Sequence, residues 1–204
     1  MIESAELRGI FPIGLGVFKR TVPITSEELE TVSSSIAVKN TYNLGGNDYR
    51  LLNRPELKSI SEFCSACADL YYNTMMGHKS KVEITESWSN ETKPGQRHHS
   101  HQHKNSIISG VFYLSDTSES AIEFLSPTRS ISTIEDHVPD ENLHDFNTNT
   151  MLITTPPNTC VVFPSWLEHQ VKINSGVESR YSIAFNTFFS KGQTIGKHSA
   201  SLSL

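Results

Sequence analysis

The chain has 204 residues and a mass of 22.8 kDa, a length at which we expect a single domain. Its 17 Lys and Arg against 22 Asp and Glu give a formal net charge of −5, so it has no general positive surface for nucleic-acid phosphates or an anionic membrane. Composition therefore excludes a general polyanion binder. It leaves unexplained nine His, four of which lie between residues 98 and 103.

The expected compartment is the cytoplasm. No run of about 18 apolar residues is present, and the N-terminal segment lacks the basic and apolar regions of a signal peptide. Three cysteines, Cys64, Cys67 and Cys160, are too few for a disulfide framework, which fits a reducing compartment. A Cys-x-x-Cys pair can be redox-active or bind a metal, but no second pair exists, and we favour buried helix positions for Cys64 and Cys67.

The first elements expected along the chain are a strand and a short helix. Residues 9–18 are apolar and interrupted by glycine, which favours a strand. Thr25 and Glu28 form a capping box, which predicts the start of a helix. The apolar face of this helix is expected at Leu29, Val32 and Ile36.

A longer helix follows, opened by Pro55 and ended by Gly77. Apolar residues recur at helical spacing at Leu57, Ile60, Phe63, Cys64, Cys67, Tyr71 and Met75. We expect this side of the helix to pack on a sheet. Together with the preceding elements it forms the predicted N-terminal part of the domain, residues 1–80.

From residue 81 the pattern changes to short strands separated by turn residues, which is typical of an antiparallel sandwich or barrel. The expected strands are 82–88, 107–114, 121–125, 151–154, 159–163, 170–173 and 180–188. Residues 126–150 are polar and acidic, and they are expected to form a long loop, either a solvated connection or a lid over a site. The predicted organisation is one domain over 1–204, with its β core at 81–190 and a tail at 191–204.

The histidine cluster has metal-ligand spacing. In an extended segment, side chains two residues apart point to the same side, so either His99 and His101 or His101 and His103 can present two imidazoles to one ion. His169, near a late strand, is the candidate third ligand. Three protein ligands leave coordination positions open for substrate and oxygen, as a catalytic metal site requires.

The last predicted strand carries a candidate anion receptor. Alternation places Arg180, Ser182, Ala184 and Asn186 on one face. A buried guanidinium binds a carboxylate with two hydrogen bonds, and the Ser182 hydroxyl adds another, so a dicarboxylate could contact the metal at one end and Arg180 at the other. The alternative is an exposed arginine on an edge strand.

Further motifs lie around these residues: Trp88-Ser89-Asn90, Gly95, the segment 101–106 (HQHKNS), the segment 109–114 (SGVFYL), Phe163-Pro164-Ser165 with His169, and the segment 180–186 (RYSIAFN). In their order and spacing, these motifs resemble a family of 2-oxoglutarate-Fe(II) oxygenases found in phages and marine bacteria. The resemblance covers roughly residues 85–190. It implies a mainly β fold with flanking helices, in which a double-stranded β-helix (jelly-roll, cupin-like) barrel follows an N-terminal α/β portion.

The resemblance also implies site roles. It makes His101, His103 and His169 the Fe(II) ligands, and Arg180, helped by Ser182, the partner of the distal carboxylate of 2-oxoglutarate. The family's spacing favours the pair His101 and His103. The implied activity is an Fe(II)- and 2-oxoglutarate-dependent dioxygenase, a hydroxylase that releases succinate and carbon dioxide.

One departure from the wider superfamily concerns the ligands. His103 stands where the usual two-His, one-carboxylate set has an aspartate. Glu123 and Glu168 are candidates to supply the missing negative charge from behind the ligands. Tyr113 is a candidate to hydrogen-bond the co-substrate or, equally, a core tyrosine. Trp88 and Asn90 could line the substrate side, although for Trp88 we favour a packing role.

Two other classes remain open from the sequence. One is a cupin-like three-His metalloprotein or dioxygenase that does not use 2-oxoglutarate, in which Arg180 is structural. The other is a non-catalytic barrel that serves as a binding module. The substrate, a small molecule or a peptide, is not encoded in any motif; we expect no nucleic-acid or membrane partner, and a homodimer is the default oligomer.

Overall fold

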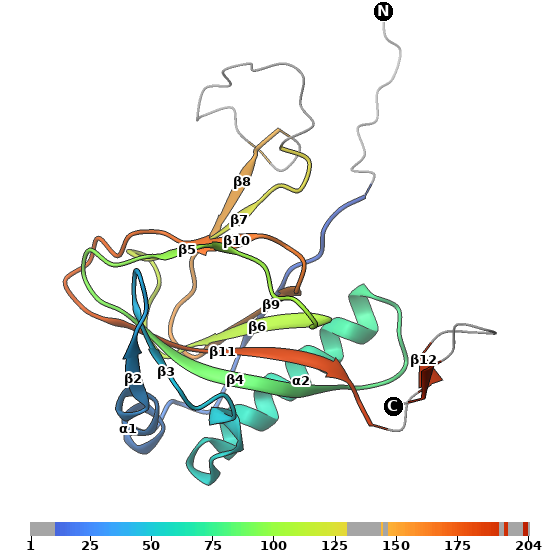
Figure 1. Cartoon of the computed structure of the whole chain (residues 1–204), viewed down its shortest axis with the longest axis horizontal. Coiled ribbons are helices and arrows are strands. Elements are labelled where there is room, and N and C mark those ends of the chain that lie inside the picture. Colours follow the sequence, from blue (N-terminus) through green and yellow to red (C-terminus); the bar gives the residue numbers. More distant parts are fainter. Residues whose placement is uncertain (1–10, 130–143, 145–146, 192–193, 196–201, 204) are drawn as a thin grey trace, which may run out of the picture.

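The computed structural model of the chain describes residues 11–129, 144, 147–191, 194–195 and 202–203. Two antiparallel sheets face one another, and the long helix α2 (Lys58–Met75) lies across the outer face of the larger one (Figure 1). The strand order is β1-β9-β6-β11-β4-β3-β2 in the larger sheet and β5-β10-β7-β8 in the smaller. This architecture confirms the expected mainly β, jelly-roll fold. No helix among the described residues is long and apolar enough to cross a membrane.

The larger sheet combines N-terminal strands with the core strands. Its members are β1 (Gly16–Lys19), β2 (Ile36–Lys39), β3 (Leu44–Gly46), β4 (Val82–Thr92), β6 (Ile108–Tyr113), β9 (Thr159–Pro164) and β11 (Arg180–Phe189). The smaller sheet contains β5 (His98–His101), β7 (Ile122–Leu125), β8 (Thr150–Ile153) and β10 (His169–Val171). The remaining elements are α1 (Ser26–Ser34), the 3-10 turns η1 (Leu51–Asn53) and η2 (Pro55–Leu57), and the paired strands β12 (Thr194–Ile195) and β13 (Leu202–Ser203).

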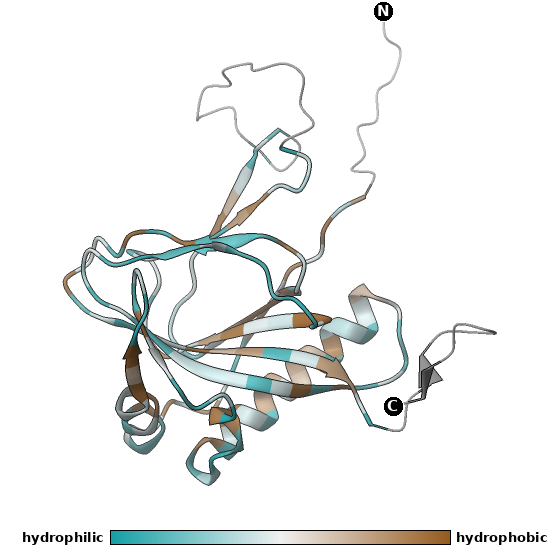
Figure 2. Cartoon of the chain, viewed as in Figure 1, coloured by the Kyte–Doolittle hydropathy of each residue, from teal (hydrophilic) through white to brown (hydrophobic). Residues whose placement is uncertain are grey.

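Strand β9 shows how the fold makes two apolar cores. All six of its residues are buried, because α2 covers one face of the larger sheet and the smaller sheet covers the other. Cys160 and Val162 pack towards α2, whereas Val161 and Phe163 point between the sheets. Figure 2 shows the apolar residues along α2 and the central strands that build the first core. The three cysteines are unpaired and buried there, as expected for Cys64 and Cys67.

Local signals predicted both helices well. The Thr25 side chain accepts a hydrogen bond from the Glu28 amide, and the Glu28 carboxylate accepts one from the Thr25 amide, so the predicted capping box is present. Pro55 begins η2, which leads directly into α2, and Gly77 follows the helix with φ +71°.

Several expectations were wrong at element boundaries. Within the described residues the first strand begins only at Gly16, Ile36 opens β2 instead of continuing α1, and Met75 is 52% exposed instead of buried. The hairpin of β2 and β3 was not predicted, because its short strands have almost no alternation: β2 has mostly exposed residues and β3 contains two glycines. Most of the predicted loop 126–150, with its lid alternative, lies outside the described residues.

Candidate metal centre

Three imidazoles meet between the two sheets. His101 ends β5, His103 lies two residues further on, and His169 begins β10, directly opposite His101 in the strand register. One ring nitrogen from each lies within 4.8 Å of the other two. Of the described His, Cys, Asp and Glu residues, these form the one group of three or more that could hold a metal ion. The pair that meets His169 is therefore His101 and His103, and not His99 and His101.

Backbone carbonyls orient two of the three rings. The Nδ1 atom of His101 lies 2.8 Å from the carbonyl oxygen of His99, and Nδ1 of His169 lies 2.9 Å from that of Leu167. Since a carbonyl only accepts, Nδ1 must carry the hydrogen in both rings, which leaves each Nε2 with a free lone pair for a metal.

The rings are neutral at ordinary pH. Burial lowers the pKa of His169 to about 3 and that of His103 to about 4, and it also lowers the pKa of His101. Neighbouring imidazoles in the cluster add to the shift, because a charge on one disfavours a charge on the next. A metal ion therefore does not have to displace a second proton from these imidazoles near neutral pH.

A buried arginine faces the same space. Arg180, 5% exposed, opens β11, and its Nη1 donates a hydrogen bond to the carbonyl of Ser120. Its Nε has no partner among the described residues, and neither has the Tyr113 hydroxyl or the Ser182 hydroxyl. Burial lowers the pKa of Arg180 and raises that of Tyr113 to about 12. An ionised guanidinium beside two unpaired hydroxyls is costly without an acceptor, so this arrangement suits an anion.

A cavity of about 230 Å³ joins the imidazoles to these orphaned polar groups. It is lined by all three predicted imidazoles, by Arg180, Ser182 and Tyr113, and by Asn43, Trp88, Asn90, His98, His99, Val111, Ile122, Val171 and Ala184. The residues present therefore fit a metal ion at one end and a small carboxylic acid at the other.

Two predicted carboxylates have other partners. Glu123 accepts a hydrogen bond from Gln170 and lies 3.7 Å from Lys172, and Glu168 binds Ser100 and Arg129. Alternation along the strand explains these orientations. Because the His169 side chain points into the cavity, the side chains of Glu168 and Gln170 on either side of it point the other way, and Glu123 lies opposite Gln170 in the register. The expectation that these residues lend negative charge to the ligands was wrong.

Two further cavity residues were not expected there: the sequence predicts that His98 faces solvent or lies behind the ligands, and it gives Asn43 no role. His98 lies beside His101, with ring centroids 4.5 Å apart, and burial lowers its pKa to about 4. Asn43, at the turn between β2 and β3, is 2% exposed and reaches the cavity from outside the β core. No motif marks Asn43; only the hairpin places it there.

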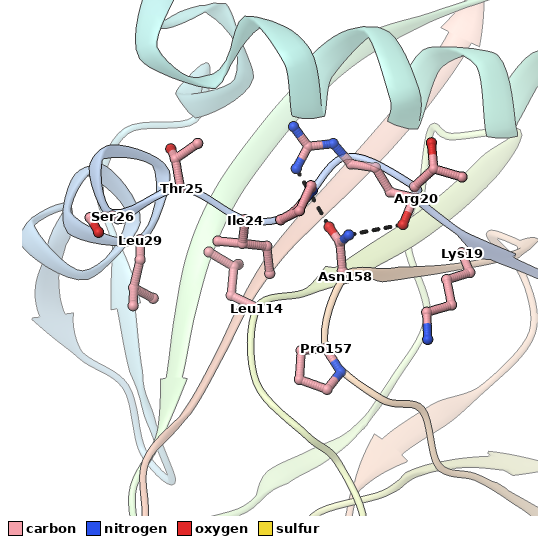
Figure 3. Close-up of a pocket in the computed structure, with 11 residues that line it drawn as sticks. Lys19, Arg20, Ile24, Thr25, Ser26, Leu29, Leu114, Pro157 and Asn158 are labelled. Carbon is pink, nitrogen blue, oxygen red and sulfur yellow. Dashed lines mark hydrogen bonds between the residues drawn. The ribbon is translucent and has the colours of Figure 1, made fainter.

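A second hollow of about 550 Å³ lies near the start of α1 (Figure 3). Arg20 beside it forms a 2.7 Å ion pair with Glu28, and Asn158 accepts from Arg20 and donates to its carbonyl oxygen. Asn158 has a positive φ of +68°, which asparagine adopts more readily than most residues. These polar groups already bind one another, so the hollow offers structural contacts and no evident ligand chemistry.

Comparison with known proteins agrees with this geometry. The family model described as "Putative 2OG-Fe(II) oxygenase" matches residues 86–186. No curated protein matches the chain. Among solved structures, the α-ketoglutarate-dependent carbocyclase SnoK of nogalamycin biosynthesis aligns with TM-score 0.63 at 11% identity, covering 88% of this chain and 81% of its own.

Two further solved structures contain ligands. The epimerase SnoN in complex with Fe3+, α-ketoglutarate and nogalamycin RO has TM-score 0.58 and 11% identity, with 87% of this chain and 79% of SnoN covered. HygX from Streptomyces hygroscopicus, with nickel and 2-oxoglutarate bound, has TM-score 0.50 and 11% identity, with 86% and 82% covered. At such identities these structures show the shared fold.

Proposed function

Because this chain belongs to the 2OG-Fe(II) oxygenase family, we propose that His101, His103 and His169 hold Fe(II) and that Arg180 binds the distal carboxylate of 2-oxoglutarate. The observation that carries this assignment is the single cavity that three neutral imidazoles share with a buried, incompletely paired arginine. The family activity, oxygenation dependent on Fe(II) and 2-oxoglutarate, needs both a metal and an anion site in contact with one small space.

The donor atoms at the two ends of the cavity indicate which residues bind the carboxylate and which bind the metal. Within the described ranges, Arg180 Nε and the hydroxyls of Ser182 and Tyr113 have no hydrogen-bond partner, so a carboxylate at this end would satisfy three buried polar groups at once. The cation–π contact between Arg180 and the Tyr113 ring holds the guanidinium in place before the anion arrives. When held by the three imidazoles, iron(II) would supply the redox chemistry that couples decarboxylation of the oxo-acid to oxidation of a substrate.

The size of the cavity limits the substrate. At about 230 Å³ it is smaller than the ~300–1,000 Å³ typical of pockets that enclose drug-sized ligands. With 2-oxoglutarate inside, only a small group of the substrate can enter beside Trp88, Asn43 and Asn90. We therefore propose hydroxylation of one end group of a small molecule or of a peptide side chain, with the remainder outside.

The test is 2-oxoglutarate binding to the Ni(II)-loaded protein, followed by calorimetry, together with succinate release in the presence of Fe(II) and oxygen. Arg180→Ala is expected to weaken 2-oxoglutarate binding at least about 30-fold, since losing one partner of a buried charge contact costs about 2 kcal/mol or more. Arg54→Ala is the matched control, because Arg54 is partly exposed and pairs with Asp48. The Arg54→Ala protein should bind 2-oxoglutarate with the affinity of the parent protein.

A second candidate is favoured by the all-histidine ligand set: a three-His dioxygenase that does not use 2-oxoglutarate. The same experiment separates the two. If Arg180→Ala binds 2-oxoglutarate as tightly as the parent protein, or if neither binds it, the arginine assignment is wrong and the second candidate gains. A parent protein that binds no divalent metal would exclude both.

We also propose that the protein acts in the cytoplasm. Its three cysteines are unpaired, which supports a reducing compartment. Cell fractionation with a tagged chain tests this, and recovery from an oxidising compartment would contradict it.

A further inference from the structure

His103 differs from the other two candidate ligands in what orients its ring. His101 and His169 each donate from Nδ1 to a backbone carbonyl. The ring of His103 makes no hydrogen bond to any described residue; only its backbone amide is held, by the carbonyl of Ser165 at 3.0 Å. The main chain therefore fixes where His103 sits but not how its imidazole is turned.

Packing must then orient the His103 ring. Its ring neighbours are His101 and His169, with centroids 5.0 and 5.2 Å away, and Trp88 at 5.8 Å with an interplanar angle of 49°. The first two are candidate ligands themselves, and each can turn towards the metal independently of His103. Trp88 is the one aromatic neighbour of His103, among the described residues, that would not bind the metal.

The strand fixes the backbone of Trp88. Trp88 lies in the middle of β4, paired with Ala184 of β11, and both residues line the cavity. The neighbouring residue Ser87 accepts a hydrogen bond from the Leu52 amide and donates its own amide to the Tyr49 carbonyl. The Tyr49 ring packs against Trp88 with centroids 6.5 Å apart. A large planar group in a rigid strand can restrict the rotation of a neighbouring ring.

We propose that Trp88 is the positioning residue for His103: its indole face restricts the orientation of the His103 ring, as backbone carbonyls fix the rings of His101 and His169. The inference rests on the proposed function, since it treats His103 as a metal ligand. Substitution of a residue that orients a metal ligand without binding the metal typically weakens metal affinity by about 10- to 100-fold. A ligand held by packing alone is also the one whose bond to the metal depends most on a single neighbouring side chain.

The experiment is a double-mutant cycle on metal affinity, without 2-oxoglutarate and without turnover. Dissociation constants for Co(II) are measured by competition with a chromophoric chelator for the parent protein, Trp88→Leu, His103→Ala and the double variant. Trp88→Leu is expected to weaken Co(II) binding about 10-fold. In the His103→Ala background the same change should have little effect, because Trp88 then has no ligand to orient.

A spectroscopic signature accompanies the cycle. The visible absorption of bound Co(II) reports its coordination, so the spectrum of Trp88→Leu should shift towards that of His103→Ala, and Trp88→Phe, which keeps a flat ring, should restore the parent spectrum. Trp166→Leu is the matched control: Trp166 is the other tryptophan and 51% exposed, and its loss should not change the affinity. If Trp88→Leu does not fold, Trp88→Met replaces it in the cycle.

The outcomes separate two failures. Equal weakening by Trp88→Leu in both backgrounds, or no weakening in the parent, overturns the positioning role. A parent protein that binds no Co(II) instead overturns the proposed metal site itself.

Discussion

The guanidinium of Arg180 lies over the face of the Tyr113 ring, with Cζ 5.4 Å from the ring centroid. The two residues stand on neighbouring strands, since Ser182 of β11 pairs with Tyr113 of β6. Arg180 is thus held by an aromatic face and one carbonyl, with no carboxylate partner among the described residues. The charge is available to a ligand because no ion pair within the described part of the chain competes for it.

Tyr113→Phe should separate stability from binding. The Tyr113 hydroxyl is buried and has no hydrogen-bond partner in the part of the chain that the structure describes, so removing it should leave the free energy of unfolding unchanged or raise it. The same change should weaken 2-oxoglutarate binding to the metal-loaded protein about 2- to 10-fold, the value of one hydrogen bond of about 0.5–1.5 kcal/mol. Chemical denaturation and calorimetry measure the two quantities. A loss of stability with unchanged affinity would make Tyr113 a core residue only.

Stability of the metal-free protein should depend on pH through the buried imidazoles. Burial lowers the pKa of His169 to about 3 and that of His103 to about 4. The unfolded chain takes up protons on these residues as the pH falls through about 6.5, but the folded protein does not until the pH approaches 4. The free energy of unfolding should therefore decrease on acidification between about pH 6.5 and pH 4, by up to about 1.4 kcal/mol per pH unit for each histidine.

Denaturation in the presence of a chelator measures this slope. His169→Gln removes one titrating group and should make the slope shallower. A parent protein whose stability is flat across that range would contradict the burial of neutral imidazoles.

The ion pair between Arg20 and Glu28 should be a major stabilising contact. Its side chains are 3% and 4% exposed, and Arg20 also donates to Ser59. Glu28→Gln leaves a buried guanidinium without its counter-charge, which should lower the free energy of unfolding by about 3–5 kcal/mol. Glu62→Gln, in a largely exposed pair with Lys58, should change it by less than about 1 kcal/mol. Equal effects in denaturation experiments would refute the distinction.

Gly110 should resist substitution for steric reasons. A Cβ added there would lie 2.2 Å from the ring of Phe185, a fully buried side chain of the first core. Gly110→Ala should therefore destabilise the protein by about 1–3 kcal/mol. Gly14→Ala provides the comparison, because its Cβ would come too close only to the end of the Met75 side chain, which is unbranched and half-exposed and can adopt another rotamer. In thermal unfolding, Gly110→Ala should lower the melting temperature more than Gly14→Ala does.

Local patterns in the sequence determined the chemistry and much of the scaffold. Alternation along 180–186 placed Arg180 and Ser182 on one face, and the structure has both in the cavity, with Tyr181 and Ile183 on the side of α2. The capping box at Thr25 and the helix after Pro55 are local hydrogen-bonding and steric signals, so they needed no tertiary information.

Only the tertiary structure decided which residues share a space. His99 and His101 are two residues apart, and so are His101 and His103, so spacing alone did not distinguish the two pairs. The pairing of β5 with β10 places His101 opposite His169, and His103 lies close to both. It likewise turned Glu123 and Glu168 away and brought Asn43 in from a hairpin with no sequence signal. Residue type specifies what a side chain can bind, whereas contacts between strands distant in sequence depend on register, which no short window of sequence contains.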